Sequence, residues 1–231
     1  MKKNNLTVLI TGGSSGFGLE LTRKFIRKKC KVIICSRDYR KLKKAGKDIN
    51  SKKLLYYSCD VRNPEEIGRI VNKIKKIDIL VNCAGIYSRS SLINVSESLI
   101  SAVIDTNLKG AIYFTHAVLP AMIKRNSGLI ININSLTGLN GKKEQSLYAA
   151  SKFGLRGFTE SLREELEHTK IKILEIYPGS MNTQIYKNTG INKISYRRID
   201  PALVADLTLY ILENSKFNLI NNILVNGVRG N

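Results

Sequence analysis

The sequence predicts an α/β protein built on a doubly wound parallel sheet of about seven strands, with helices on both faces. Short apolar runs of strand length alternate with helical patterns along the whole chain. The first such run leads directly into a glycine-rich turn and then into a helix. No internal repeat or linker divides the 231 residues, so we expect residues 1–231 to form one domain.

Composition and charge restrict the class of function. The net charge of +20 would attract polyanions. The basic residues are spread along the chain and do not alternate with aromatic residues, so we expect no specific nucleic-acid partner. No apolar run approaches the roughly 18 residues of a bilayer span, and the apolar stretch after the basic start is too short for a signal peptide. The four cysteines lack metal-ligand spacing, which predicts free thiols in a reducing cytoplasm and no metal site.

The glycine-rich turn predicts a phosphate-binding loop. Residues 6–10 (LTVLI) read as a buried strand, residues 11–18 (TGGSSGFG) follow it, and a helical pattern begins directly afterwards. Gly12 permits a tight turn, Gly16 lets the backbone approach a pyrophosphate, and Gly18 allows close packing of the helix. The first helical N–H groups then offer donors and a partial positive charge to the phosphates of a dinucleotide.

The end of the second strand, at residues 31–36 (KVIICS), indicates which dinucleotide binds. An acidic side chain about 20 residues after the glycines bonds the ribose 2′-hydroxyl of NAD, whereas an arginine accepts the 2′-phosphate of NADP. Here Ser36 and Arg37 are followed by Asp38. Asp38 either binds the ribose or caps the next helix, and its place after the arginine favours capping. We therefore expect NADP(H) to be preferred, with NAD(H) also usable.

The remaining elements alternate in the same way. Further strands are expected at residues 53–59, 78–81, 129–133, 171–177 and 223–225. Helices are expected over residues 39–48, from Pro64 after the capping residue Asn63, and over 96–125, 146–167 and 201–212. Residues 184–200 show little periodicity and are interpreted as a lid or loop.

Three polar side chains predict carbonyl chemistry. Tyr148 and Lys152 are four residues apart, so a helix places the phenol and the ammonium on one face. A fixed ammonium lowers the pKa of a phenol towards the working range for proton transfer. Ser135 follows the strand at 129–133, and parallel sheets bind ligands at the carboxyl ends of their strands. Asn107 lies inside an expected helix, where it is either solvated or part of a site.

With these elements placed, the chain resembles the short-chain dehydrogenase/reductase family over about residues 6–213. The motifs that carry the resemblance are the glycine-rich loop, Asp60-Val61, Asn82-x-Ala84-Gly85, the set Asn107, Ser135, Tyr148 and Lys152, and Pro178-Gly179 with Thr183. The resemblance implies a Rossmann fold with a cofactor site formed by Thr11, Gly12, Ser14, Ser15, Gly16, Phe17, Gly18, Ser36, Arg37, Asp60, Val61, Asn82, Ala84, Gly85, Tyr148, Lys152, Pro178, Gly179 and Thr183.

The resemblance also implies a catalytic role for four residues. Tyr148 would exchange a proton with the substrate oxygen, and Ser135 would orient that oxygen. Lys152 would lower the phenol pKa and bond the nicotinamide ribose, and Asn107 would hold a water that links Lys152 to solvent. The chain departs from the family pattern at Cys83 and at Asn134, where the family commonly has Asn and Ser respectively. Its ending at residues 224–230 also lacks the usual Val-Asp-Gly-Gly.

The expected function is therefore that of an NADP(H)-dependent oxidoreductase that interconverts a carbonyl and an alcohol of a small molecule by hydride transfer. We expect it to be a carbonyl reductase. The alternative is a non-catalytic dinucleotide-binding or nucleic-acid-associated protein on the same fold. We expect a homodimer or homotetramer that assembles through the helices at 97–125 and 146–167. The substrate would contact residues 86–95, 137–147 and 184–200, whose side chains offer no decisive charge and suggest an apolar ligand.

Overall fold

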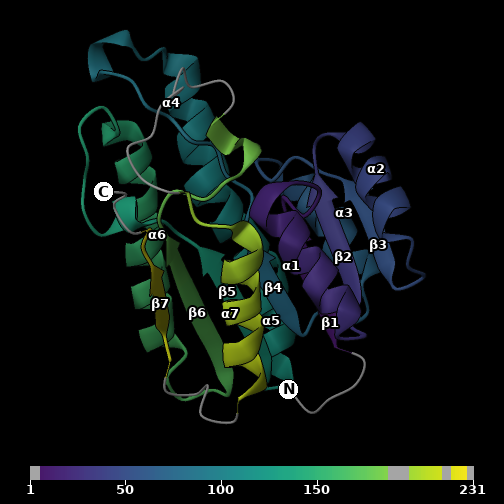
Figure 1. Ribbon diagram of the computed structural model, residues 1–231. Coiled ribbons are helices and arrows are strands. Elements are labelled where there is room, and N and C mark those ends of the chain that lie inside the picture. The colour runs from purple at the N-terminus through teal and green to yellow at the C-terminus, as the bar shows by residue number, and fades with distance from the viewer. Residues whose placement is uncertain (1–5, 187–197, 215–219, 228–231) are drawn as a thin grey trace.

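The structure is a computed structural model that describes residues 6–186, 198–214 and 220–227. A seven-stranded parallel sheet lies at its centre, in the strand order β3-β2-β1-β4-β5-β6-β7, with helices on both sides (Figure 1). The strands are β1 (Thr7–Thr11), β2 (Lys31–Ser36), β3 (Leu54–Ser58), β4 (Ile79–Asn82), β5 (Gly128–Ile133), β6 (Ile171–Pro178) and β7 (Asn222–Val225). The predicted doubly wound Rossmann sheet is confirmed.

Two layers of helices cover the sheet. The helices are α1 (Gly16–Arg27), α2 (Tyr39–Ile49), α3 (Pro64–Lys73), α4 (Glu97–Ile104), α5 (Gly110–Lys124), α6 (Ser146–Glu165) and α7 (Pro201–Glu213). Side chains of α1, α2 and α7 pack on one face, and those of α3, α5 and α6 pack on the other. Strand β1 shows why the strands are apolar throughout, because Val8 and Ile10 join the first core while Leu9 joins the second.

The strand order reverses between β1 and β4, and this reversal positions the ligand site. The two strands pair directly, with Ile10 opposite Val81. The chain leaves β1 for α1 on one face of the sheet, whereas it leaves β4 towards α5 on the other face. The two loops therefore separate at the carboxyl ends of the strands and open a crevice between them.

Side-chain caps start several of the helices. The carboxylate of Asp38 accepts a hydrogen bond from the N–H of Lys41 at the start of α2, at 3.1 Å. Asn63 caps α3 ahead of Pro64 in the same way. These caps satisfy N–H groups that have no partner inside the helix. The predicted capping roles of Asp38 and Asn63 are confirmed.

The prediction of one continuous helix over residues 96–125 is wrong. Two helices, α4 and α5, are joined there by a π-helical turn, η2 (Asp105–Lys109), in which Gly110 bonds to the carbonyl five residues earlier. Asn107 lies inside this turn, and its side-chain amide binds the backbone of Ile86. The turn thus coincides with a contact to a loop that lies outside the helix, as is common for π-helical turns near functional sites.

The expected lid at residues 184–200 is described only at its two ends. The first end forms a short 3-10 helix, η4 (Gln184–Tyr186), and residues 187–197 lie outside the described residues. Met181, which precedes the segment, and Ile199 form an isolated parallel bridge, so the far end of the segment returns to the chain just before its start. Among the helices that the structure describes, none is both long enough and apolar enough to cross a bilayer.

Candidate active site

A cleft of about 350 Å³ opens where the loops after β1, β4, β5 and β6 meet. The predicted residues that line it are Gly12, Ser15, Gly16, Phe17, Gly18, Ala84, Gly85, Ser135, Tyr148, Lys152, Pro178, Gly179 and Thr183. The predicted residues outside its wall are Thr11, Ser14, Ser36, Arg37, Asp60, Val61, Asn82 and Asn107. The cleft therefore brings the glycine-rich loop together with Ser135, Tyr148 and Lys152.

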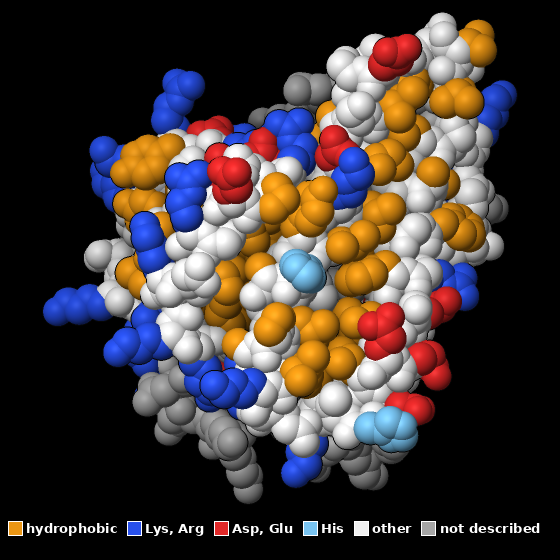
Figure 2. All heavy atoms as spheres, turned by 180° about the vertical axis from the view of Figure 1, so that it is seen from behind, with side chains coloured by type: hydrophobic (Ala, Val, Ile, Leu, Met, Phe, Trp, Pro, Cys, Tyr) orange, Lys and Arg blue, Asp and Glu red, His pale blue; other side chains and the backbone are white. Residues whose placement is uncertain are grey.

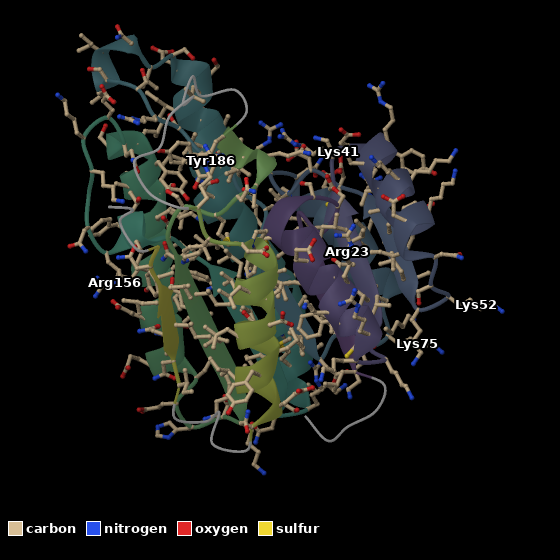
Figure 3. The ribbon with its side chains drawn as sticks, in the orientation of Figure 1. Arg23, Lys41, Lys52, Lys75, Arg156 and Tyr186 are labelled. Carbon is tan, nitrogen blue, oxygen red and sulfur yellow. The ribbon has the colours of Figure 1, made fainter. Side chains whose placement is uncertain are left out.

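Four more residues of the wall, Ile86, Gln184, Ile185 and Tyr186, lie in the ranges that were expected to contact the substrate. The residues that sequence reasoning did not place in the site are Lys41, Cys83, Ile133, Asn134 and Met181. Most of them adjoin a predicted motif, so extending each motif by a few residues would have found them. Lys41 is different, because it reaches the cleft from the first turn of α2. Figure 3 shows Lys41 at the edge of the sheet where the cleft opens.

The glycine-rich loop fits the phosphates of a dinucleotide. Gly12 and Gly16 have φ values of +68° and +51°, which residues other than glycine rarely adopt. A Cβ at Gly12 would lie 3.0 Å from the Cα of Ala84, so the loops after β1 and β4 meet closely. At the start of α1, Ser15 makes no side-chain cap and the first turn carries no acidic residue. The N–H groups of this turn therefore remain available to an anion.

Two of the predicted residues outside the wall support the loops from behind. The hydroxyl of Thr11 accepts hydrogen bonds from the N–H groups of Cys83, at 2.9 Å, and Ala84, at 3.0 Å. The Asn82 amide donates to Asn132 on the neighbouring strand β5 at 2.9 Å. Thr11 and Asn82 thus hold the loop after β4 and the centre of the sheet in place.

Ser135, Tyr148 and Lys152 converge at one end of the cleft. The Ser135 hydroxyl forms a hydrogen bond with the Tyr148 phenol and accepts another from the N–H of Thr137 at 3.1 Å. The Lys152 ammonium donates to the carbonyl oxygen of Ile133 at 2.8 Å and lies 5.9 Å from the centre of the Tyr148 ring. A hydroxyl, a phenol and a buried cation therefore meet where a substrate oxygen can bind.

Burial determines the ionisation of these groups. Removal from water raises the pKa of the Tyr148 phenol well above its usual value, and the phenols of Tyr186 and Tyr87 raise it further against the opposing hydrogen bond from Ser135. Burial likewise lowers the pKa of the Lys152 ammonium to about 8. The net shift of the Tyr148 pKa is therefore upward, opposite to the lowering expected from the ammonium, because desolvation is its largest cause.

Asn107 connects the loop after β4 to helix α6. Its Oδ1 accepts the N–H of Ile86 at 2.7 Å, and its Nδ2 donates to the Ile86 carbonyl at 2.9 Å and to the Ser151 hydroxyl at 3.0 Å. The residue is only 2% exposed, so the alternative of a solvated side chain is wrong. Because Ser151 precedes Lys152 on α6, the amide fixes the position of the lysine relative to the cleft.

A buried polar network behind this end of the cleft was missed from the sequence. It centres on Glu175 of β6, which is fully buried. The Glu175 carboxylate accepts hydrogen bonds from Asn134 at 2.7 Å, Thr159 at 3.3 Å and Tyr177 at 2.6 Å. Asn134 also donates to the backbone carbonyl of Lys152 and accepts from the N–H of the residue that follows it. A glutamate inside an otherwise apolar strand was the available signal.

The opposite end of the cleft is basic, and its two carboxylates are paired. Asp38 lies 3.6 Å from the Lys41 ammonium, and Asp60 binds the Arg62 guanidinium through both carboxylate oxygens. This pairing lowers the pKa of Asp60, and the charge of Arg37 lowers it further. Arg37 is exposed beside this pair. Arg37 therefore remains as a cation that could receive a phosphate at this end, and Lys41, although it is paired with Asp38, lines the cleft there.

Three tyrosines pack together at the end of the cleft that contains Ser135. The ring of Tyr87 stands edge-on to Tyr148 and to Tyr186, with ring centres 5.0 Å and 4.9 Å apart. The guanidinium of Arg198 lies 5.1 Å from the centre of the Tyr186 ring. These rings cover the Tyr148 phenol, which accounts for its burial.

Comparison with known proteins identifies the family. A profile described as short chain dehydrogenase matches residues 6–193. An uncharacterized oxidoreductase of Staphylococcus saprophyticus is 33% identical over 227 residues, which cover 95% of this chain and 96% of the relative. The chain therefore belongs to the short-chain dehydrogenase family, and it is an oxidoreductase of that family.

Solved structures agree with the fold and with a nicotinamide dinucleotide as cofactor. The closed form of serine dehydrogenase complexed with NADP+ is 30% identical, with a TM-score of 0.85, over 95% of this chain and 94% of that one. An actinorhodin polyketide ketoreductase solved with NADPH is 28% identical, with a TM-score of 0.87, over 96% of each chain.

Proposed function

We propose that this protein is an NADP(H)-dependent oxidoreductase that interconverts a carbonyl and an alcohol, working chiefly as a reductase. The observation that carries the proposal is the convergence of Ser135, Tyr148 and Lys152 at one end of a cleft whose other wall is the glycine-rich loop. We also propose that residues 1–231 form one domain that both binds the dinucleotide and performs the reaction.

Each part of the cleft has its own role in this proposal. The dinucleotide, when bound, supplies the hydride that the carbonyl carbon accepts. The turn at Gly12 and Gly16 and the start of α1 hold its phosphates, and residues 178–183 hold its nicotinamide end. The Ser135 hydroxyl orients the substrate oxygen, and Tyr148 gives that oxygen its phenolic proton.

Lys152 stabilises the phenolate that Tyr148 leaves behind. Burial keeps the phenol protonated at neutral pH, which suits an acid that donates in the reductive direction. Once the proton has left, the ammonium close to the ring becomes the main compensation for the negative charge. A proton taken up from solvent then restores the phenol for the next turnover.

The preference for NADP(H) is supported by the basic end of the cleft. Asp38 caps α2 and pairs with Lys41, so its carboxylate is engaged by the protein. Lys41 lines the cleft and Arg37 is exposed at the end of β2, and an arginine binds phosphate through two parallel hydrogen bonds. The two solved relatives named above contain NADP+ and NADPH, which supports the same choice.

The alternative of a non-catalytic binding protein does not explain why Lys152 is buried. A protein that only binds a dinucleotide does not need an ammonium held beside a buried phenol, since burying a charge is unfavourable unless it has a use. We further propose that the protein is a homodimer or homotetramer without a specific nucleic-acid partner. Its four free thiols support a reducing compartment such as the cytoplasm.

The substitution Tyr148→Phe tests the proposal. We expect oxidation of NADPH by a panel of ketones and aldehydes to fall by about 10²–10⁴-fold, because the variant lacks the proton donor. The affinity for NADPH, measured by fluorescence titration, should stay near that of the wild type and so control for folding. A variant that keeps more than about a third of the activity would contradict the assignment of Tyr148 as the proton donor.

A further inference from the structure

A second, smaller cavity of about 40 Å³ lies beside the first. It shares Ser135, Tyr148, Gly179 and Tyr186 with the larger cleft, so a group bound in it would be attached close to the reacting carbonyl. The other side chains that matter to its chemistry are Thr137, Lys142, Gln145 and Ser180. Tyr186, which walls both cavities, is labelled in Figure 3.

The small cavity offers hydrogen-bond donors and a positive charge. Lys142 is an exposed residue of the wall, and its ammonium forms no ion pair within the part of the chain that the structure describes. The Thr137 hydroxyl donates to the carbonyl oxygen of the Gln145 side chain at 3.1 Å. The side-chain oxygen of Gln145 thus has a partner, and the two N–H groups of the same amide can donate hydrogen bonds to a ligand.

No carboxylate among the described residues opposes this charge at the wall of either cavity. The nearest one in sequence, on Glu144, accepts the guanidinium of Arg89 at 3.0 Å. A second cation, Arg198, stacks on the outer ring of the wall, 5.1 Å from the centre of Tyr186. The local potential is therefore positive on the substrate side of the Tyr148 phenol.

Size restricts the anion that fits. A cavity needs roughly 10–15 Å³ of such volume for each water molecule, so about 40 Å³ accommodates about three heavy atoms. A carboxylate has three heavy atoms, whereas a phosphate has five. A planar carboxylate can accept from the Lys142 ammonium and the Gln145 amide at the same time.

We propose that Lys142 and Gln145 bind the carboxylate of the substrate, and this inference rests on the proposed reductase function. The substrate is then a short oxo acid or the corresponding hydroxy acid. In the reductive direction the carbonyl carbon gains a hydride and its oxygen gains the Tyr148 proton. The dinucleotide is oxidised and the carboxylate is unchanged. This assignment replaces the apolar ligand that the sequence suggested, because the small cavity places Lys142 and Gln145 next to the reacting group.

Kinetics with acids and their esters test the site. The substrates are 3-oxobutanoate and 4-oxopentanoate, each compared with its methyl ester, which keeps the carbonyl and removes the charge. For the wild type we expect kcat/KM for the better acid to exceed that of its ester by about tenfold or more. Lys142→Met should lower this ratio by about tenfold through a higher KM for the acid. Lys143→Met, which removes the neighbouring charge outside the cavity, is the matched control and should leave the ratio unchanged.

A binding measurement separates failure of the site from failure of the reductase. We expect 3-hydroxybutanoate to bind the NADP+-saturated wild type in isothermal titration, and to bind Lys142→Met about tenfold more weakly. Equal rates for acids and esters, or a ratio that Lys142→Met does not change, would overturn the carboxylate site and leave the reductase intact. If no carbonyl compound oxidises NADPH, the reductase is wrong, and loss of carboxylate binding in Lys142→Met would still support the site.

Discussion

At the scale of single residues, the proposed choice of NADP(H) depends on three neighbours at the end of β2. Ser36 carries no charge, Arg37 is exposed, and Asp38 is engaged as the cap of α2 and as the partner of Lys41. The chain therefore presents a cation rather than a carboxylate where the two dinucleotides differ. Lys41, which lines the cleft, adds a second positive charge at this end.

The substitution Arg37→Ala should weaken NADPH selectively. Loss of charge-assisted hydrogen bonds to a 2′-phosphate corresponds to about a 10- to 150-fold rise in the Michaelis constant for NADPH. The exposure of Arg37 places the expected value near the lower bound. The Michaelis constant for NADH should hardly change, because NADH has no 2′-phosphate. Initial rates with both cofactors measure the two constants.

Arg40→Ala is the control for this prediction. Arg40 is an exposed arginine in the first turn of α2, three residues after Arg37. Its removal reports the general effect of losing one positive charge near the site, which salt screens. A wild-type enzyme that uses NADH as well as NADPH would show that Asp38 is the ribose ligand and that the preference proposed here is wrong.

At the scale of elements, strand β6 carries an ionisable side chain in the core. Glu175 has no exposed surface, and burial raises the pKa of its carboxyl group even though Tyr177, Asn134, Arg163 and Thr159 act in the opposite direction. The network ties β6 to the loop after β5 and to helix α6. Through Asn134, this cross-link holds the backbone at Ser135 and at Lys152.

Relative to the wild type, the Glu175→Gln variant should become more stable as the pH rises. A raised pKa means that, above the ordinary value of 4.5, the folded state keeps a proton that the unfolded state has lost. The free energy of unfolding of the wild type therefore falls as the pH increases through this window. Glutamine does not titrate, and its amide can still accept from Asn134 and donate to the Tyr177 hydroxyl.

Urea unfolding at pH 4.5, 6 and 8, at one protein concentration, measures this effect. The midpoint of Glu175→Gln relative to the wild type should increase with pH, whereas Glu165→Gln, at an exposed site on α6, should show no such trend. A difference that stays constant would show that folding does not raise the pKa of Glu175, and a difference that decreases with pH would show that folding lowers it.

The break between α4 and α5 is a second feature at this scale. Gly110 begins α5 directly after the π-helical turn, and a Cβ there would lie 2.8 Å from the Val61 side chain. The helix can therefore approach the loop after β3 only at a glycine. Together with the Asn107 contact, this close approach positions the turn at the edge of the cleft.

At the scale of the whole molecule, one face is unusually apolar. Figure 2 shows hydrophobic side chains gathered over the face that carries α4, α5 and α6. Its exposed members include Ile100 at 37%, Ile123 at 50% and Phe153 at 43% exposure. An exposed apolar face of this kind commonly marks a protein interface, and a second copy of the chain is the occupant that we propose.

Phe153→Asp should disrupt this assembly. We expect the wild type to be at least a dimer by light scattering at micromolar concentration, and the variant to shift towards the monomer, because it would bury a carboxylate without a partner. Tyr210→Asp on α7, where the side chain is 66% exposed on the other face of the sheet, should still be at least a dimer. A monomeric wild type would rule the interface out.

The sequence by itself determined the order of the elements and the chemistry of the main motifs. These features depend on neighbouring residues: the apolar run of β1 and the glycines after it are contiguous, and Tyr148 and Lys152 share a face because they lie one helical turn apart. The capping role of Asp38 is local in the same way.

Only the tertiary structure decided how these groups are surrounded. The Tyr148 phenol is buried by Tyr87 and Tyr186, which come from other loops, and this burial reverses the pKa shift expected from the lysine alone. Asn107 finds its partner 21 residues away, and Asn134 finds Glu175 41 residues away. Desolvation and long-range hydrogen bonds depend on which distant segments meet, and local patterns carry no information about that meeting.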